Sequence, residues 1–171
     1  MKEINLNNLQ LKTFTEQDVL DYCQLNDINP DNITELYLLN NELIDISGLK
    51  LFKNLENLSL SNNQIKDISV LKYLKNLEHL NLERNQLTDI SVLKDLKKLK
   101  ILNISNNKIT DISSLSFLTK LEVLFIENLK LESDQIDYIN NINYLDELYS
   151  YNGFKNIKIL KKLNKNIRII K

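Results

Sequence analysis

The chain has 171 residues, with 22 Lys and Arg against 23 Asp and Glu and a formal net charge of -1. This length suits one hydrophobic core and leaves no room for a repeat array together with a separate catalytic domain. The balanced charge argues against a general nucleic-acid binder, which would carry an excess of basic residues. One cysteine excludes an internal disulfide, and no run of 18 apolar residues is present to span a membrane.

The first predicted element is an N-terminal cap over residues 1–32. Residues 15–18, Thr-Glu-Gln-Asp, resemble a capping box in which Asp replaces the usual Glu or Gln. Apolar residues then follow at helical spacing, which predicts a helix over about residues 15–25. Cys23 in this helix is interpreted as a small core residue, with a reactive thiol as the alternative. We expect the preceding apolar residues to pack beside the helix: Ile4, Leu6, Leu9, Leu11 and Phe14.

Four regular repeats follow over residues 33–120, with a period of 22 residues. Each unit reads L-x-x-L-x-L-x-x-N-x-I/L-x-D-I-S-x-L-x-x-L, and successive units open at Ile33, Leu55, Leu77 and Leu99. Leu58 and Leu60 are two apart, so on a strand both point into the core while their neighbours face solvent. Leu71 and Leu74 are three apart, which suits a 3₁₀ turn on the far side of the unit. The pattern predicts a stack of units that share one core.

Two polar residues recur in every repeat. One column is asparagine, for which we expect buried amides bonded to turn backbone, with a ligand-binding row as the alternative. The other column is aspartate, for which we expect capping of turn N–H groups, with a calcium ladder as the alternative. The columns are Asn41, Asn63, Asn85 and Asn107, and Asp45, Asp67, Asp89 and Asp111.

The repeat resembles the internalin-type leucine-rich repeat and, less closely, that of phosphatase-regulating leucine-rich proteins. The matching segments are NNQIKDISVLKYLKNL at 62–77, RNQLTDISVLKDLKKL at 84–99 and NNKITDISSLSFLTKL at 106–121. The resemblance implies an α/β fold, a right-handed leucine-rich repeat solenoid. Its parallel β-sheet would line the concave face, with 3₁₀ or short helices and turns on the convex face. It also implies ligand binding by the concave sheet. We expect six or seven strands.

The last third of the chain, residues 121–171, is predicted to hold irregular repeats and a C-terminal cap. Leu124 and Ile126 mark a strand, and Ser133 is predicted as the N-cap of a short helix through Ile136 and Ile139. A further strand is expected over residues 145–151, half a repeat over 152–160 and a closing strand over 167–170. The whole chain is thus predicted to be a single leucine-rich repeat domain.

Candidate functional residues are those that the repeat does not dictate. On the predicted sheet face acidic side chains outnumber basic ones, whereas lysines gather on the return segments. Exposed Tyr and Phe side chains are typical interface anchors, with burial under the C-terminal cap as the alternative. We predict that the following residues bind a partner: Glu35, Tyr37, Leu39, Glu56, Glu78, His79, Glu83, Ile101, Phe125, Tyr149 and Tyr151.

These features predict a non-catalytic binding protein with no cofactor and no metal. The single histidine, His79, has no predicted nucleophile beside it, and no cluster of metal ligands is visible. We expect a protein partner with a basic surface, no direct contact with nucleic acid or membrane, and a monomer when alone. The N-terminal sequence MKEINLNNLQ contains no secretion signal, so we expect a cytoplasmic location.

Such a module acts by occupying or reshaping its partner, so we expect a regulator or inhibitor. One form is an inhibitor encoded by a phage or mobile element and directed at a nuclease or other nucleic-acid-processing defence enzyme. An acidic concave face would compete there for a basic channel. The alternative of another class is a structural or adhesive leucine-rich repeat fragment of a surface protein.

Overall fold

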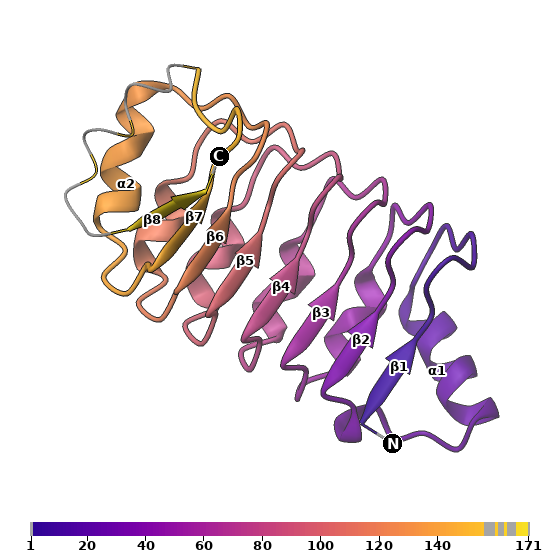
Figure 1. Cartoon of the computed structure of the whole chain (residues 1–171). Coiled ribbons are helices and arrows are strands. Elements are labelled where there is room, and N and C mark those ends of the chain that lie inside the picture. The colour runs from indigo at the N-terminus through magenta and orange to yellow at the C-terminus, as the bar shows by residue number, and fades with distance from the viewer. Residues whose placement is uncertain (1, 156–159, 161–162, 164–166, 171) are drawn as a thin grey trace.

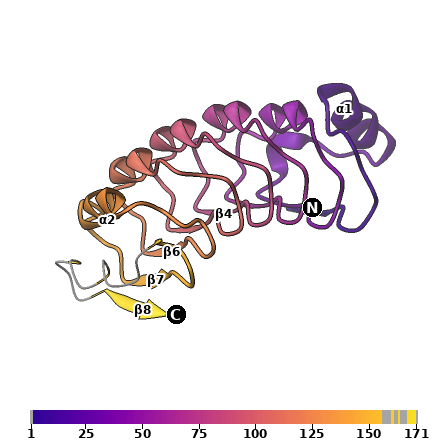
Figure 2. The same cartoon turned by 90° about the horizontal axis from the view of Figure 1, so that it is seen from above.

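The computed structural model describes residues 2–155, 160, 163 and 167–170. Over these residues the chain forms a curved stack with a parallel sheet on its inner side and helical turns on its outer side (Figures 1 and 2). The sheet has eight strands in chain order, so each strand pairs with those before and after it. The strands are β1 (Glu3–Asn5), β2 (Glu35–Tyr37), β3 (Asn57–Ser59), β4 (His79–Asn81), β5 (Ile101–Asn103), β6 (Val123–Phe125), β7 (Glu147–Tyr149) and β8 (Arg168–Ile170).

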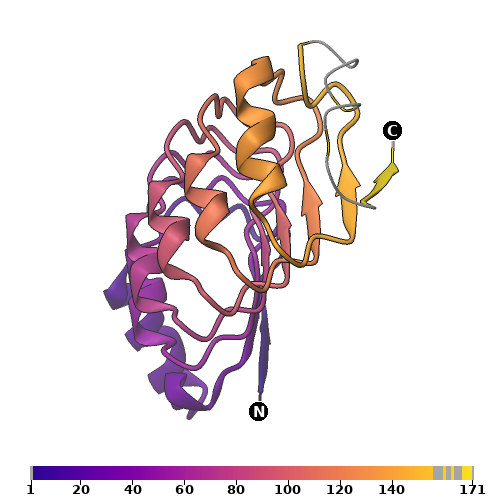
Figure 3. The same cartoon turned by 90° about the vertical axis from the view of Figure 1, so that its left-hand side faces the viewer.

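The repeat fixes the register of the central strands. From β2 to β6 each residue pairs with the residue 22 positions later, as Leu36 does with Leu58 and Leu58 with Leu80. The middle residue of each of these strands is buried, and the leucines of successive units merge into one continuous core. An end view shows the two layers, with helical turns on one side and strands on the other (Figure 3). The predicted solenoid is confirmed.

The outer layer consists of short 3₁₀ helices, and in the four regular repeats an aspartate before each helix accepts a hydrogen bond from its first N–H. Asp67 Oδ1 accepts a hydrogen bond from the Ser69 N–H at 2.7 Å, and Asp89 accepts one from Ser91 at 2.7 Å. The leucines of these turns, such as Leu71 and Leu74, are fully buried. The predicted capping by the aspartate column is confirmed. The helices span Pro30–Asn32, Ser47–Leu51, Ser69–Tyr73, Ser91–Asp95, Ser113–Phe117 and Ser133–Gln135.

The asparagine column joins neighbouring repeats. The Asn85 Nδ2 donates to the carbonyl of Leu60 at 2.9 Å and to that of Leu82 at 3.1 Å, while its Oδ1 accepts from the Ile65 N–H at 3.0 Å. The same three bonds recur at Asn63, one repeat earlier, and at Asn107, one repeat later. Asn63 and Asn85 are buried as predicted, whereas Asn107 is half-buried. Each amide therefore replaces turn hydrogen bonds that would otherwise be missing.

At the N-terminal end the predicted helix is α1 (Glu16–Leu25). The Thr15 side chain accepts from the Asp18 N–H and the Asp18 carboxylate accepts from the Thr15 N–H, which completes the capping box. Val19 and Cys23 of α1 are buried against the first repeat. The helix begins so close to Gly48 that an added Cβ there would lie 2.4 Å from the Thr15 carbonyl oxygen. This contact explains a glycine where the next repeats have Val70 and Val92.

The predicted packing of residues 4–14 beside α1 is wrong at two points. Residues 3–5 form strand β1, which pairs with β2 and brings the sheet to eight strands, not six or seven. Leu9 is 53% exposed and so does not join the core, whereas Phe14 is buried and stacks on Phe52 at 6.1 Å between ring centroids. The repeat pattern does not predict strand β1, because its residues pair with residues 32 positions later in β2, and a full α-helix lies between the two strands.

The C-terminal end departs from the repeat in its helical layer. The helix α2 (Ile136–Asn140) is present, with Gln135 at its N-cap. Ser133 is the first residue of the 3₁₀ turn before α2, and the extended Glu132 is the N-cap of that turn. The prediction of Ser133 as N-cap is therefore wrong. Strands β7 and β8 lie where strands were predicted. The half repeat predicted over 152–160 includes residues 156–159, which lie outside the described part of the chain.

Candidate functional site

The concave face is built from the two outward residues of each strand. Because the central strands keep one register, these residues align in two columns that run along the stack. We use "concave face" for these columns, which are Glu35, Asn57, His79, Ile101, Val123 and Glu147, and Tyr37, Ser59, Asn81, Asn103, Phe125 and Tyr149. Unlike the buried leucines, most of these side chains differ from one repeat to the next, although Asn81 and Asn103 occupy the same position. The fold does not require them.

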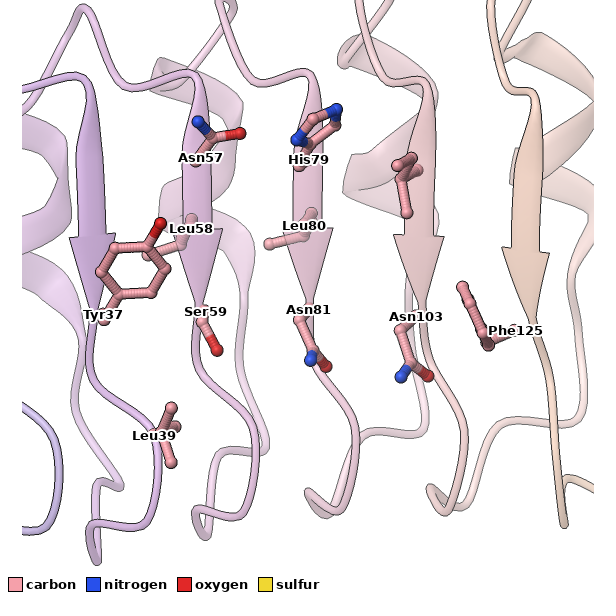
Figure 4. Close-up of a pocket in the computed structure, with 11 residues that line it drawn as sticks. Tyr37, Leu39, Asn57, Leu58, Ser59, His79, Leu80, Asn81, Asn103 and Phe125 are labelled. Carbon is pink, nitrogen blue, oxygen red and sulfur yellow. The ribbon is translucent and has the colours of Figure 1, made fainter.

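A hollow of about 480 Å³ occupies the centre of the concave face, between β2 and β6. Figure 4 shows apolar side chains at both sides of the hollow, with Tyr37 and Leu39 at one side and Phe125 at the other. Polar side chains from β3, β4 and β5 lie between them. The complete lining is Tyr37, Leu39, Asn57, Leu58, Ser59, His79, Leu80, Asn81, Ile101, Asn103 and Phe125. The hollow therefore has a shallow floor that contains no Asp, Glu, Lys or Arg side chain, and it has apolar groups at its two ends.

Several polar groups in the hollow have no partner. In the part of the chain that the structure describes, neither the Asn57 amide nor the His79 ring makes a hydrogen bond, and the same holds for Asn81 Nδ2. The Asn81 Oδ1 accepts from the Glu83 N–H at 3.0 Å. Asn103 is more fully engaged, because its Oδ1 accepts from the Ser105 N–H and its Nδ2 donates to Glu83 Oε2 at 3.3 Å. The free donors and acceptors at Asn57, His79 and Asn81 are available to a bound molecule.

Aromatic side chains are held in place at both ends. Phe125 and Tyr149 stack with 4.0 Å between ring centroids and 19° between planes. The Tyr149 hydroxyl donates to Glu147 Oε2 at 3.0 Å, and this bond raises the pKa of Tyr149. At the other end the Tyr37 hydroxyl donates to Glu35 Oε2 at 2.7 Å, which with burial raises the pKa of Tyr37 to about 12. Both tyrosines therefore stay neutral at physiological pH and present fixed rings.

Charged residues, most of them acidic, lie just before and just after the strands and outside the lining of the hollow. We call the residues directly before the strands the leading border: Glu56, Glu78, Lys100, Glu122 and Asp146. We call Glu83 and Glu127, which follow the strands, the trailing border. Lys100 Nζ lies 2.6 Å from Glu78 Oε2, which raises the pKa of Lys100 and lowers that of Glu78. Glu56, Glu122, Asp146 and Glu127 have no ion pair within the described residues, so both borders keep a negative charge.

The structure places the eleven residues predicted from sequence in different surroundings. Five of them line the hollow: Tyr37, Leu39, His79, Ile101 and Phe125. Glu35 and Tyr149 contact its aromatic ends. Glu56, Glu78 and Glu83 lie on the borders. Tyr151 lies beyond β7 and is 56% exposed. The C-terminal strand β8 extends the sheet beside β7, and Tyr151 stays uncovered by the described residues.

The predicted site omitted the polar floor. Asn57, Ser59, Asn81 and Asn103 line the hollow but were passed over in favour of charged and aromatic residues. Strand alternation already places these four residues on the sheet face, but it does not show that they line a hollow. Within the described part of the chain no three His, Cys, Asp or Glu residues gather as a metal site would require. No helix described there is long and apolar enough to cross a membrane.

The fold and the concave face together define a class of protein, a solenoid of stacked repeats that exposes an open sheet. The family of Leucine Rich repeats (2 copies) matches residues 31–73, 53–95 and 97–141, which together are more than half of the chain. The chain therefore belongs to the leucine-rich repeat family, and its solved relatives make it an internalin-type member. Domains of this family are typical protein–protein interaction modules.

Three solved structures show the similarity. An internalin (inlF) from Listeria monocytogenes is 31% identical over 81% of this chain and 41% of its own, with a TM-score of 0.72. An internalin C2 from the same organism is 25% identical over 98% and 79%, with a TM-score of 0.68. A leucine-rich repeat protein from Leptospira interrogans is 26% identical over 99% and 42%, with a TM-score of 0.75. The chain thus spans less than half the length of the first and third structures. Among curated proteins, no sequence matches closely enough to count as a relative.

Proposed function

We propose that this protein is a non-catalytic binding protein that holds another protein against its concave face. The observation that carries the proposal is the hollow between β2 and β6, most of whose lining lies at positions that the repeat leaves free to vary. Within the described residues the Asn57 amide, the His79 ring and the Asn81 Nδ2 make no hydrogen bond, and the aromatic ends of the hollow are fixed by neighbouring side chains. Rigid aromatic groups around a central patch are typical of interface anchors.

The surroundings of His79 support a role in binding rather than in catalysis. A nucleophile activated by histidine would be a Ser, Thr or Cys side chain within hydrogen-bond distance of the ring. In the described structure no such bond reaches the His79 ring, and the single cysteine is buried in α1. Burial also raises the pKa of the Cys23 thiol, which makes it a poor nucleophile.

The charge of the two borders supports a partner with a basic surface. Glu56, Glu122, Asp146 and Glu127 form no ion pair with the residues that the structure describes, so they would attract and orient a positively charged protein. We propose that the protein regulates or inhibits such a partner in the cytoplasm by covering its basic surface. In one form of this role, the covered surface is the nucleic-acid channel of a nuclease or related defence enzyme.

A second candidate is a segment of a larger surface protein that adheres to other cells. The observation that favours it is the length comparison, since this chain spans 41% of the similar internalin (inlF). The two candidates differ in where the partner is found. An intracellular partner supports the regulator, and a partner recovered only from the exterior of intact cells supports the adhesive segment.

Affinity capture with matched variants tests the proposal. The wild-type chain, Phe125→Ala and Lys72→Glu are immobilised, and proteins retained from cell lysate or from intact cells are identified by mass spectrometry. We expect a partner that binds wild type and Lys72→Glu alike. Its affinity, measured by calorimetry with purified partner, should fall at least about tenfold with Phe125→Ala, which is roughly 1.4 kcal/mol. Equal binding by Phe125→Ala and loss with Lys72→Glu would place the interface on the convex face and refute the proposal.

A further inference from the structure

We propose that the segment held in the hollow is an extended polypeptide that crosses the strands, with two apolar side chains about six residues apart and basic side chains between them. This inference rests on the proposed function and specifies the chemistry of the partner. It is carried by the polar floor, the distance between the apolar ends and the charge of the borders.

The polar floor favours extended backbone over helix. An extended segment carries one free N–H and one free C=O per residue, whereas a helix has bonded most of its own groups internally. The amide of Asn57, the Nδ2 of Asn81 and the His79 ring, which make no hydrogen bond to any described residue, supply donors and acceptors for such a backbone. A helix packed into the hollow would leave these groups without partners, at a cost in binding free energy.

The spacing of the apolar ends sets the distance between the two anchors. Tyr37 lies on β2 and Phe125 on β6, four strands further along the sheet. At about 4.8 Å per strand this is roughly 19 Å, and an extended chain covers that distance in about six residues at about 3.3 Å each. Six is an even number, so side chains at the first and seventh positions point to the same side of the segment. Both anchors can therefore face the sheet at once.

The middle of the hollow limits the side chains between the anchors. Ser59, Asn81 and Asn103 form the floor on β3, β4 and β5, and they would leave a large apolar side chain in contact with polar atoms. We therefore expect small or polar residues at the third and fifth positions of the segment, which also face the sheet. Ile101 on β5 adds apolar surface close to the second anchor.

The borders supply the charge complementarity. A segment that crosses the strands runs parallel to both borders, so its outward-facing positions lie between Glu56 and Glu122 on one side and Glu127 on the other. Long basic side chains at these positions can bend toward unpaired carboxylates on either side. A nucleic-acid strand in the same place would bring its phosphates close to these carboxylates and be repelled. The charge thus favours a basic peptide over RNA or DNA.

Selection from a random peptide library tests this inference. A phage-displayed library of twelve-residue peptides is selected on the full chain, with counter-selection on the Phe125→Asp variant. We expect enriched peptides to share two apolar residues six apart, with Lys or Arg between them. A synthetic peptide of that pattern should bind, and moving one apolar residue by one position should weaken it at least about tenfold, because the second anchor then faces away from the sheet.

Variants of the chain locate the bound peptide. Tyr37→Ala and Phe125→Ala should each weaken the synthetic peptide at least about tenfold, while Lys94→Glu on the convex side should leave its affinity unchanged. Thermal unfolding and far-UV circular dichroism of each variant show whether the fold is intact. Asn81→Leu is a second probe that removes a polar floor group without touching the aromatic ends.

Three results would overturn the inference. The first is enrichment of peptides whose apolar residues have helical spacing, three and seven residues apart. The second is peptide binding whose affinity does not change with Tyr37→Ala, Phe125→Ala or Asn81→Leu. The third is concave binding of a single-stranded oligonucleotide with no enriched peptide. If a captured protein needs Phe125 yet is not displaced by any selected peptide, the proposed function stands and the extended segment is refuted. If no protein is captured but the peptide binds as described, the extended-segment chemistry is supported and the regulatory role is not.

Discussion

Two sets of asparagines in this protein share their chemistry and differ in their surroundings. Asn63 and Asn85 are buried behind the strands, and each bonds backbone groups of two neighbouring repeats. Asn57 and Asn81 are half-buried on the concave face, and each keeps side-chain groups unbonded within the described residues. The first set recurs at one position in every regular repeat, and the second set does not. Recurrence therefore separates asparagines that the fold needs from those that a partner can use.

The largest expected effect breaks this comparison at a buried position. Asn85→Leu leaves the Ile65 N–H without its partner and removes one of two amide donors from the Leu60 and Leu82 carbonyls, which keep those of Asn63 and Asn107. At about 1–3 kcal/mol for the buried N–H left unbonded and about 1 kcal/mol for each lost bond, we expect the free energy of unfolding to fall by about 3 kcal/mol or more. Urea denaturation measures this change. A midpoint equal to that of Asn81→Leu would show that the two sets are equivalent after all.

The matched change on the concave face should act on binding instead. Asn81→Leu removes one hydrogen bond, from the Glu83 N–H, and an Nδ2 group that makes no bond to the described residues. The free energy of unfolding should therefore change by less than about 1 kcal/mol. Affinity for a concave partner should fall about tenfold, roughly 1.4 kcal/mol, because polar contacts are lost. Calorimetry with the purified partner measures it. Unchanged affinity together with strong destabilisation would reverse the roles of the two sets.

A third change tests whether the N-terminal helix α1 contributes to stability without contributing to binding. Thr15→Ala removes one half of the capping box of α1, and loss of such a cap costs about 1 kcal/mol. The helix covers only the first repeat, so partner binding in the hollow should not change. Denaturation midpoints and binding affinity, measured on the same protein, distinguish the two effects. A loss of binding would mean that α1 takes part in the interface.

The aspartate column predicts a dependence of stability on pH. A hydrogen bond from the Ser91 N–H lowers the pKa of Asp89 below its ordinary value of 3.8. The carboxylate therefore stabilises the folded state above about pH 4, and this stabilisation disappears as pH falls through the lowered pKa. Asp89→Asn should reduce the unfolding midpoint at pH 7 and show a weaker dependence on acid than the wild type. A difference between the two that grows below pH 4 would contradict this sign.

The smallest expected effect concerns Cys23. Its thiol is buried in α1, and burial raises its pKa, so it should react slowly with alkylating reagents while the protein is folded. Cys23→Ala should leave the affinity for a concave partner unchanged. Mass spectrometry after timed alkylation measures the reactivity. If alkylation of folded protein were fast and abolished binding, the interpretation of Cys23 as a core residue would be wrong.

The sequence predicted the fold of the regular repeats well because each structural role recurs at a fixed spacing. Leu58, Leu80 and Leu102 recur on one side of the sheet, so the pattern needed no knowledge of distant contacts. Strand β1 was missed because Ile4 pairs with Leu36 across an interposed helix, and no repeat signals such a contact. Ser133 was misplaced because a 3₁₀ turn, whose N-cap is Glu132, precedes α2.

The candidate site was predicted only in part, for a related reason. Alternation along a strand places Asn57 and Asn81 on the concave face as firmly as it does Tyr37. It does not reveal which polar groups remain unbonded. That depends on neighbours in other repeats, as when Asn103 donates to Glu83 across one unit while the Asn57 amide finds no partner in the described structure. Only the assembled sheet shows the floor as one surface with two acidic borders.

The constant register between β2 and β6 also has an evolutionary consequence. Every bond of the Asn85 amide reaches a residue of its own repeat or of the one before it. A tandem duplication of 22 residues within this region would therefore reproduce each bond in the added turn, whereas an insertion of another length would leave some amides opposite the wrong backbone groups. Each added turn would lengthen the hollow by about 4.8 Å, so changes in repeat number offer lineages a stepwise means of changing the span between anchors.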